Sequence, residues 1–206
     1  MNLTAAMNWR YATKKFDPTK VVSEPLIDAL LDAGNLTATS YGLQPYQFVV
    51  IQNHELQDKL VESSYGQRQV ADASHVIVVA TRTNVDAEYI NEYIAMVEQQ
   101  RGLEAGSMED YKNVMIGTFS RMTEEHRMEW AAKQAYLVLG TLLAACAMLE
   151  LDSCPMEGFV PEEYNQLLNL NSKNLHAAVV LPVGYRAEDD VAQHQPKVRR
   201  PLSEMV

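Results

Sequence analysis

Residues 124–149 read EEHRMEWAAKQAYLVLGTLLAACAML, the longest unbroken helical pattern in the chain. The first turns are polar, and from Ala135 onward apolar residues cover nearly every side of the predicted helix. Such a helix is buried all round, and a chain of 206 residues offers a limited core to enclose it. We therefore expect a homodimer to supply the remaining cover, with small residues that permit close helix approach at Gly140, Ala144, Ala145 and Ala147.

Three segments of strand length accompany this helix. They are 46–51 (YQFVVI), 74–81 (SHVIVVAT) and 176–183 (HAAVVLPV), all rich in aromatic or β-branched residues. Helical spacing predicts further helices near 24–33, 53–64, 86–102, 108–123 and 161–169, the first of them stopping at Gly34. Strands separated by helices indicate an α/β or α+β arrangement. No linker or repeat divides the chain, so we expect residues 1–206 to form a single domain.

The composition limits the partners and the compartment. With 27 Asp plus Glu against 17 Lys plus Arg, the chain has no general basic surface for nucleic acid or anionic lipid. Two cysteines suggest neither a disulfide framework nor a zinc site. The N-terminus has no secretory pattern, and the apolar stretch 136–149 is too short to span a bilayer. We expect a soluble cytoplasmic protein.

Positive charge gathers at the two ends of this acidic chain, whose formal net charge is −10. The N-terminal tract holds Arg10, Lys14, Lys15 and Lys20, and the C-terminal tract holds Lys197, Arg199 and Arg200. If folding brings the tracts together, they can bind a dianionic phosphate. The other interpretation is that both are solvated terminal charge.

Several common chemistries have no support in the sequence. There is no Gly-x-Gly-x-x-Gly, no Walker loop and no nucleophile elbow. The five histidines lack metal-ligand spacing, so no metal site is implied. His75 and His176 lie in apolar strands, where a structurally bonded imidazole is the expected role.

Four short segments carry a more specific signal. They are Arg10-Tyr-Ala-Thr-Lys-Lys-Phe16, Ser40-Tyr-Gly-Leu-Gln-Pro-Tyr46, Pro155-Met-Glu-Gly-Phe159 and Pro196-Lys-Val-Arg-Arg200. Together, and in this order, they resemble the FMN-dependent nitroreductase family, and most closely the oxygen-insensitive NAD(P)H nitroreductases and dihydropteridine reductases. The resemblance implies an α+β three-layer sandwich in which helices flank a central mixed sheet, built as an intertwined homodimer.

The resemblance also implies how one FMN is held. Arg10, Lys197 and Arg199 correspond to the phosphate grip, and Lys14 to a lysine at the pyrimidine edge of the ring. Segment 155–158 resembles the stretch along one ring face, where the main-chain N–H of Glu157 bonds N5. The loop 39–44 resembles one that reaches the partner subunit's flavin. The full implied set of cofactor-binding residues is Arg10, Tyr11, Ala12, Lys14, Thr39, Ser40, Gly42, Gln67, Gln69, Pro155, Met156, Glu157, Gly158, Lys197 and Arg199.

This chain departs from the family pattern at three places. Ala12 stands where a serine is common, so one phosphate-binding hydroxyl is missing unless Thr13 replaces it. Tyr11 stands where histidine or arginine is frequent. Around 66–69 some relatives place an asparagine and a lysine on the flavin, whereas this chain offers Gln67 and Gln69.

The activity that the resemblance implies is hydride transfer from NADH or NADPH through flavin N5 to a flat, electron-poor acceptor such as a nitroaromatic or quinone, with ping-pong kinetics. No side chain serves as nucleophile or dedicated acid, because the cofactor supplies the chemistry. We expect the acceptor pocket to be lined by Tyr41, Gly66, Met115, Ile116 and Phe119. The departures above motivate an alternative, a flavin-binding sensor or carrier without efficient turnover.

Overall fold

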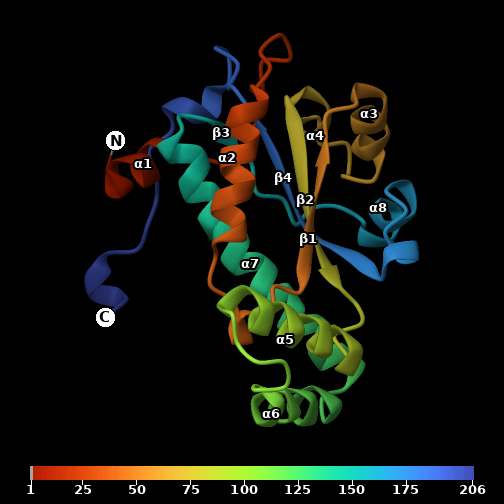
Figure 1. Cartoon of the computed structure of the whole chain (residues 1–206). Coiled ribbons are helices and arrows are strands. Elements are labelled where there is room, and N and C mark those ends of the chain that lie inside the picture. Colours follow the sequence, from red (N-terminus) through yellow and green to blue (C-terminus); the bar gives the residue numbers. More distant parts are fainter. Residues whose placement is uncertain (1) are drawn as a thin grey trace.

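The computed structural model describes residues 2–206, which fold into one antiparallel sheet with helices on both faces (Figure 1). The sheet order is β1-β2-β4-β3, with strands β1 (Tyr46–Ile51), β2 (His75–Arg82), β3 (Asp152–Ser153) and β4 (Leu175–Gly184). The helices are α1 (Leu3–Trp9), α2 (Glu24–Asn35), α3 (His54–Glu62), α4 (Gln69–Asp72), α5 (Ala87–Arg101), α6 (Glu109–Ser120), α7 (Glu124–Met148) and α8 (Pro161–Leu167). Short 3-10 turns are η1 (Ser40–Gly42), η2 (Asn171–Lys173), η3 (Val191–His194) and η4 (Leu202–Glu204).

The three-layer α+β sandwich is confirmed, but the four strands pair antiparallel, so the expectation of a mixed sheet is wrong for them. The end of β1 pairs with the start of β2, Ile51 opposite Val76. The intervening helices α3 and α4 therefore return the chain to the end of the strand it just left instead of crossing the sheet. The one parallel pairing in the described chain is an isolated bridge between Ala12 and Ser153.

Both faces of the central strand β2 are covered, so its residues 75–81 are all buried. Helices α2 and α7 cover one face, and α3, α4 and α8 cover the other (Figure 1). His75 and His176 take the expected structural roles. The Ser74 hydroxyl lies 2.9 Å from His75 Nδ1, and the Asn165 amide lies 2.9 Å from His176 Nδ1.

Helix α7 begins at a side-chain cap, where Thr123 Oγ1 accepts from His126 N at 3.2 Å. Its buried face packs on the sheet, but the chain itself does not bury it all round. An exposed or half-buried stripe remains at helical spacing, made of Lys133, Leu137, Gly140, Ala144 and Met148. Of the other expected interface residues, Ala147 is fully buried in the chain's own core and Ala145 packs against that core.

By length and composition alone, α7 would be able to cross a membrane, contrary to the estimate from its apolar stretch. In the fold, 44% of its apolar window is buried. A single helix that meets these criteria is weak evidence for a membrane span, because the core helix of a globular protein can meet them too.

The sequence predicts that Gly34 stops α2, but the helix continues through it to Asn35. A Cβ at Gly34 would lie 2.7 Å from Phe48 Cζ and 3.2 Å from a Leu142 methyl group. The glycine therefore lets α2 approach β1 and α7 closely, which is a packing role that a helix-stop signal does not reveal.

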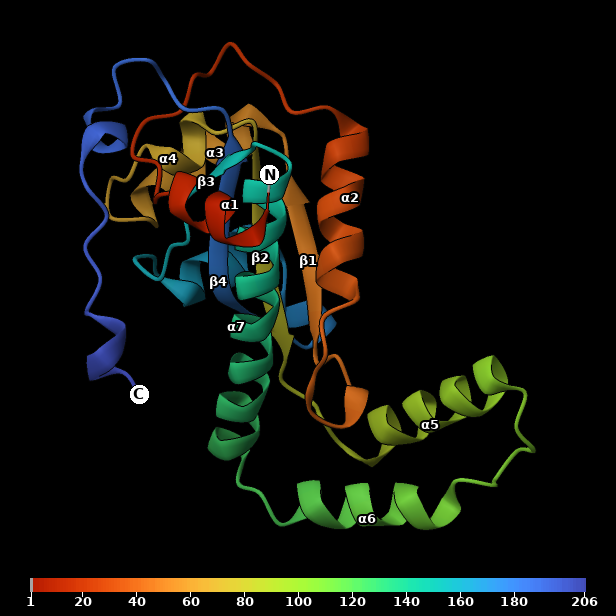
Figure 2. The same cartoon turned by 90° about the vertical axis from the view of Figure 1, so that its left-hand side faces the viewer.

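Helices α5 and α6 form a hairpin that projects beyond the sheet (Figure 2). Glu98 fastens the connecting loop, since its carboxylate accepts from Gly106 N at 3.0 Å and Met108 N at 2.8 Å. These two N–H groups lower the pKa of Glu98. The base of the hairpin has its own apolar core, which includes Met115 and Phe119.

Candidate functional site

The two ends of the chain lie side by side. Backbone bonds join them, from Asp17 N to Tyr185 O at 2.8 Å and from Ala187 N to Lys15 O at 2.9 Å. Of the two interpretations of the basic tracts, the structure favours the one in which they meet, because Lys197 Nζ donates to Arg10 O and both residues line one cavity.

Asp190 holds this junction together. The residue is 3% exposed, and its carboxylate accepts from Tyr11 Oη at 2.8 Å, Lys14 N at 2.9 Å, Lys15 N at 3.3 Å and Ala192 N at 3.0 Å. Burial opposes its charge, but these donors outweigh burial and lower the pKa of Asp190. The carboxylate thus fixes the C-terminal segment on the N-terminal one.

Arg186 makes a second connection. Its Nε donates to Asp152 Oδ1 at 2.8 Å, and its guanidinium lies 4.4 Å from the ring centroid of Trp9 and 4.6 Å from that of Tyr11. The ion pair with the Asp152 carboxylate and the two aromatic rings hold the guanidinium in place. It therefore orients the rings that precede and follow Arg10.

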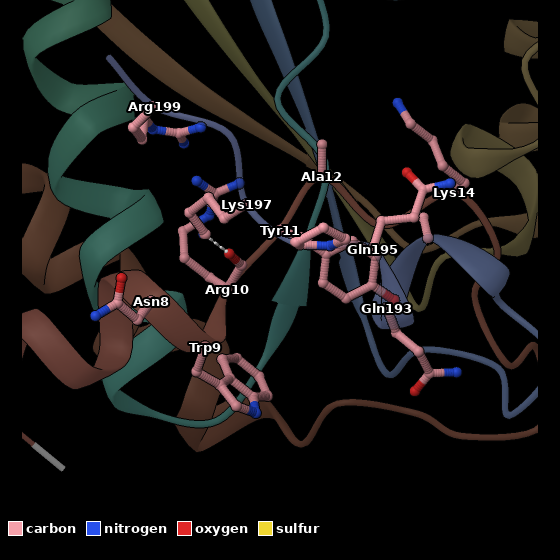
Figure 3. Close-up of a pocket in the computed structure, with 12 residues that line it drawn as sticks. Asn8, Trp9, Arg10, Tyr11, Ala12, Lys14, Gln193, Gln195, Lys197 and Arg199 are labelled. Atoms are coloured by element: carbon pink, nitrogen blue, oxygen red, sulfur yellow. Dashed lines mark hydrogen bonds between the residues drawn. The ribbon is translucent and has the colours of Figure 1, made fainter. Parts of the chain in front are cut away.

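A cavity of about 370 Å³ opens between the two tracts (Figure 3). No acidic side chain from residues 2–206 lines it, although the chain is acidic overall. The lining residues are Asn8, Trp9, Arg10, Tyr11, Ala12, Lys14, Ala192, Gln193, Gln195, Pro196, Lys197 and Arg199.

Three cations in this cavity repel one another. Burial, and then the charge of Arg199, lower the pKa of Arg10, while burial, Arg10 and Arg199 lower the pKa of Lys197. Lys197 Nζ donates to the carbonyl oxygens of Met7, at 2.9 Å, and Arg10, as Figure 3 shows for Arg10. Arg10 Nε is buried and has no acceptor among the described residues. An anion in the cavity would relieve the repulsion and satisfy this donor.

Six residues of this lining belong to the set that the sequence predicts to bind the cofactor. They are Arg10, Tyr11, Ala12, Lys14, Lys197 and Arg199. Tyr11 acts through its bond to Asp190. Thr13 does not supply the missing hydroxyl, because it is fully buried, lies outside the lining, and its Oγ1 has no partner among residues 2–206. The residues that sequence reasoning missed are Asn8, Trp9, Ala192, Gln193, Gln195 and Pro196, together with the anchors Asp190 and Arg186. Only their nearness in sequence to the basic tracts could have pointed to them.

Segment 155–158 lies near the N-terminal tract, since Ala12 bridges Ser153 two residues before Pro155. Two backbone hydrogen bonds join Met156 to Val180. Met156 N donates to Val180 O at 2.8 Å, and Val180 N donates to Met156 O at 3.1 Å. Among the described residues, the backbone N–H of Glu157 donates to no acceptor and is available to a ligand.

Side chains hold this segment from two sides. Gln67 Nε2 donates to Gly158 O at 2.7 Å, and a Cβ at Gly158 would lie 2.9 Å from that nitrogen, so a side chain there would displace Gln67. The Tyr136 hydroxyl donates to Glu157 Oε1 at 2.6 Å. Burial, followed by this bond, raises the pKa of Tyr136 to about 12. Gln69 is buried at the start of α4 and lies outside the cavity lining.

The loop 39–44 lies elsewhere, at the opposite end of the sheet from α1 and beside α5 (Figures 1 and 2). Thr39 Oγ1 accepts from Gln44 N at 3.2 Å, and Ser40 N donates to Gln134 Oε1 at 2.9 Å. Gly42 has a φ of 72°, and a Cβ there would collide with the Tyr93 hydroxyl. Within one chain, Thr39, Ser40 and Gly42 therefore do not meet the basic cavity.

The expected acceptor-pocket residues are not gathered into one opening. Met115 is 0% exposed and Phe119 2% exposed, and both belong to the core of the hairpin, although Phe119 also lines, with Ile116, a separate cavity of about 180 Å³. Ile116 is half-buried, and a Cβ placed on Gly66 would have no neighbour within 4 Å. Of the five, Tyr41 alone faces a cavity that includes residues of both α5 and the α5–α6 loop.

Comparison with known proteins shows the family to which the chain belongs. The model of the nitroreductase family matches residues 7–185. The chain belongs to the nitroreductase family. A Staphylococcus haemolyticus protein provisionally named NAD(P)H nitroreductase is 34% identical over 98% of this chain and 94% of its own. A Bacillus subtilis protein with the same provisional name is 35% identical over the same shares of the two chains.

Solved structures share the fold of this chain. A provisionally named nitroreductase from Bacillus subtilis has a TM-score of 0.88 at 18% identity, covering 98% of this chain and 96% of that one. A provisionally named nitroreductase from Exiguobacterium sibiricum, solved in complex with FMN, has a TM-score of 0.83 at 20% identity, covering 100% and 96%. At these identities the likeness concerns the fold.

Replacing Asp190 with Asn should lower the free energy of unfolding at neutral pH by about 1.5–3 kcal/mol, the range for hydrogen bonds to a charged group. Because the pKa of Asp190 is lowered on folding, its contribution is present above the ordinary carboxyl pKa and is lost as pH falls through the folded value. Urea unfolding at neutral pH and at about pH 3 measures this, and the difference between wild type and variant should shrink at the lower pH.

The matched control is Asp189→Asn, because Asp189 is exposed and pairs with Lys15 at the surface. That variant should stay close to wild type at both pH values. An Asp190→Asn penalty that is the same at both would show that the charge does not anchor the junction.

Proposed function

We propose that the protein is a homodimeric, cytoplasmic oxidoreductase that binds FMN, takes a hydride from NADH or NADPH, and reduces flat, electron-poor acceptors such as nitroaromatics or quinones. The observation that carries the proposal is the cavity between the chain ends, where Arg10, Lys197 and Arg199 repel one another and no carboxylate of the described chain joins them in the lining. A phosphate monoester is the kind of dianion that suits such a cluster.

The residues present fit FMN beyond its phosphate. Arg10, through its orphaned Nε, and Arg199 would hold the phosphate, with Lys197 beside them. Lys14 lies across Ala12 from Arg199 and Lys197 (Figure 3), where it would meet the ring rather than the phosphate. The free N–H of Glu157, in a segment held by Gln67 and Tyr136, would bond a ring acceptor.

When bound, FMN accepts and donates the hydride, and the protein supplies binding, orientation and electrostatics. The positive charge of Lys14 would stabilise added negative charge on the ring. Gln67 and Met156 hold the backbone at 155–158 in place. Because donor and acceptor would stack in one place, the two half-reactions alternate, which predicts ping-pong kinetics.

Two features support the dimer. The exposed stripe of α7 has Leu137 52% exposed and Met148 43% exposed, with Gly140 and Ala144 between them for close helix approach. The loop 39–42 lies too far from its own chain's basic cavity to contribute to it. A second copy of the chain would both cover the stripe and bring its loop to the site.

The experiment that tests the activity uses the purified full chain loaded with FMN and mixed anaerobically with NADH or NADPH. We expect the visible flavin absorption to bleach and to return when a quinone or nitroaromatic is added. Colour that stays unbleached with either nucleotide would overturn the enzyme and favour the sensor or carrier, which Ala12 and the unpartnered Thr13 hydroxyl also favour. A protein that does not bind FMN would exclude both.

Replacing Arg199 with Ala should weaken FMN binding by about 1.5–3 kcal/mol, because a charge-assisted bond to the phosphate is lost. Quenching of flavin fluorescence on binding measures the dissociation constant. Arg200→Ala is the matched control, since Arg200 is the exposed neighbour and does not line the cavity. Unchanged FMN affinity in Arg199→Ala would refute the phosphate assignment.

Replacing Leu137 with Glu should convert the dimer to monomer and lower FMN retention, because a charge would be buried in the helix pair. Sedimentation velocity measures the mass, and absorbance across the boundary measures the bound flavin. The control is Leu167→Glu, a 39% exposed leucine on α8, which should remain dimeric. A wild-type monomer that carries FMN would contradict the shared site.

A further inference from the structure

A second cavity, of about 280 Å³, lies in the α5–α6 hairpin, far from the basic cavity of the same chain (Figure 2). Tyr41 of the loop 39–44 forms one wall. The other lining residues are Tyr93, Val97, Arg101, Met108 and Tyr111. Three aromatic rings and two apolar side chains therefore surround one cation.

The aromatic wall is held rigidly. Tyr93 Oη donates to Tyr41 O at 3.0 Å, and the Tyr41 ring lies 5.9 Å from the Phe119 ring and 6.5 Å from the Tyr111 ring, centroid to centroid. Tyr41 also has a φ of 59°, in the left-handed region that a bulky residue rarely adopts. Such strained residues cluster at ligand sites, where the surrounding structure maintains them.

Among the described residues that line this cavity, Arg101 is the only charged one. Its side chain forms no ion pair and donates no hydrogen bond within the part of the chain that the structure describes. Burial and Tyr111 raise the pKa of Tyr93, and the positive charge of Arg101 acts on it in the opposite direction. The Arg101 side chain and the Tyr93 hydroxyl therefore interact electrostatically within this cavity.

We propose that this cavity is an acceptor-binding site selective for flat aromatic molecules that carry an anionic group, with Arg101 as the residue that determines the selectivity. The ring would pack against Tyr41 and Tyr111, and a carboxylate would pair with Arg101. Flat rings pack well on aromatic side chains, and guanidinium groups bind carboxylates with two parallel hydrogen bonds. The reaction that follows rests on the proposed function, in which Tyr41 belongs to a loop that reaches the partner subunit's cofactor.

A structural explanation of Arg101 predicts something different. Arg101 lies in the last turn of α5, where a cation stabilises the helix dipole whether or not a ligand is present. Arg121 is a matched residue, since it lies at the end of α6 in the same hairpin, is exposed, and does not line the cavity. Comparing variants of Arg101 and Arg121 therefore distinguishes ligand binding by Arg101 from stabilisation of a helix end, which both arginines can provide.

The experiment compares 4-nitrobenzoate with 4-nitrobenzamide, its neutral counterpart, on the FMN-loaded full chain. Binding is measured by titration calorimetry, and KM by NADH- or NADPH-dependent reduction. Wild type should prefer the anion. Arg101→Gln should reduce that preference by about tenfold in both measurements. A tenfold change is at the lower end of the range expected when one hydrogen bond to a charged group is lost. Arg101→Lys should restore part of it, and Arg121→Gln should keep the wild-type preference.

The inference and the proposed function fail separately. An equal preference in wild type and Arg101→Gln would overturn the role of Arg101, even with normal turnover of both compounds. Loss of preference in Arg121→Gln as large as in Arg101→Gln would assign the effect to the hairpin's general charge and also overturn it. Anion-selective binding that depends on Arg101, in a protein whose bound flavin is not bleached by NADH or NADPH, would support the site and refute the reductase.

Discussion

The structure depends on the antiparallel pairing of β2 with β4 at the centre of the sheet. All but the last residue of β2 is buried, so every backbone N–H and C=O there needs a partner strand and both faces need a layer of helices. Helix α7, the longest helix, packs with α2 on one face of the sheet. Helices α3, α4 and α8 cover the other face, and the loops between layers emerge at the sheet's ends.

The basic cavity is a consequence of where β4 ends. The chain leaves Gly184 beside the N-terminal tract, and Asp190 and Arg186 then fasten it there with a buried carboxylate and a ring-stacked guanidinium. The Asp190 and Asp152 carboxylates are hydrogen-bonded within these anchors and do not line the cavity. Within residues 2–206, Arg10, Lys197 and Arg199 share their lining with no carboxylate, so an acidic chain has a local site for an anion.

The elements expected from hydrophobic pattern agree largely with the structure, because each pattern reports a local property. The three strands at 46–51, 74–81 and 176–183 appear within one or two residues, as do most helices. The errors concern contacts between distant segments. Gly34 fits a helix stop by type, yet its role is set by contacts with Phe48 and Leu142. The expectation of a mixed sheet is wrong for the four strands, because strand direction depends on how distant segments pair.

The amino-acid sequence was sufficient to predict most strand and helix segments, the resemblance to the family, and the residues with the charge to hold a phosphate, because side-chain type and spacing carry that information. The antiparallel direction of the sheet, the anchoring by Asp190 and Arg186, the exposed stripe of α7 and the Arg101 cavity became visible in the folded chain alone. Each of these depends on which distant side chains share a space, and burial and electrostatics act through space rather than along the chain.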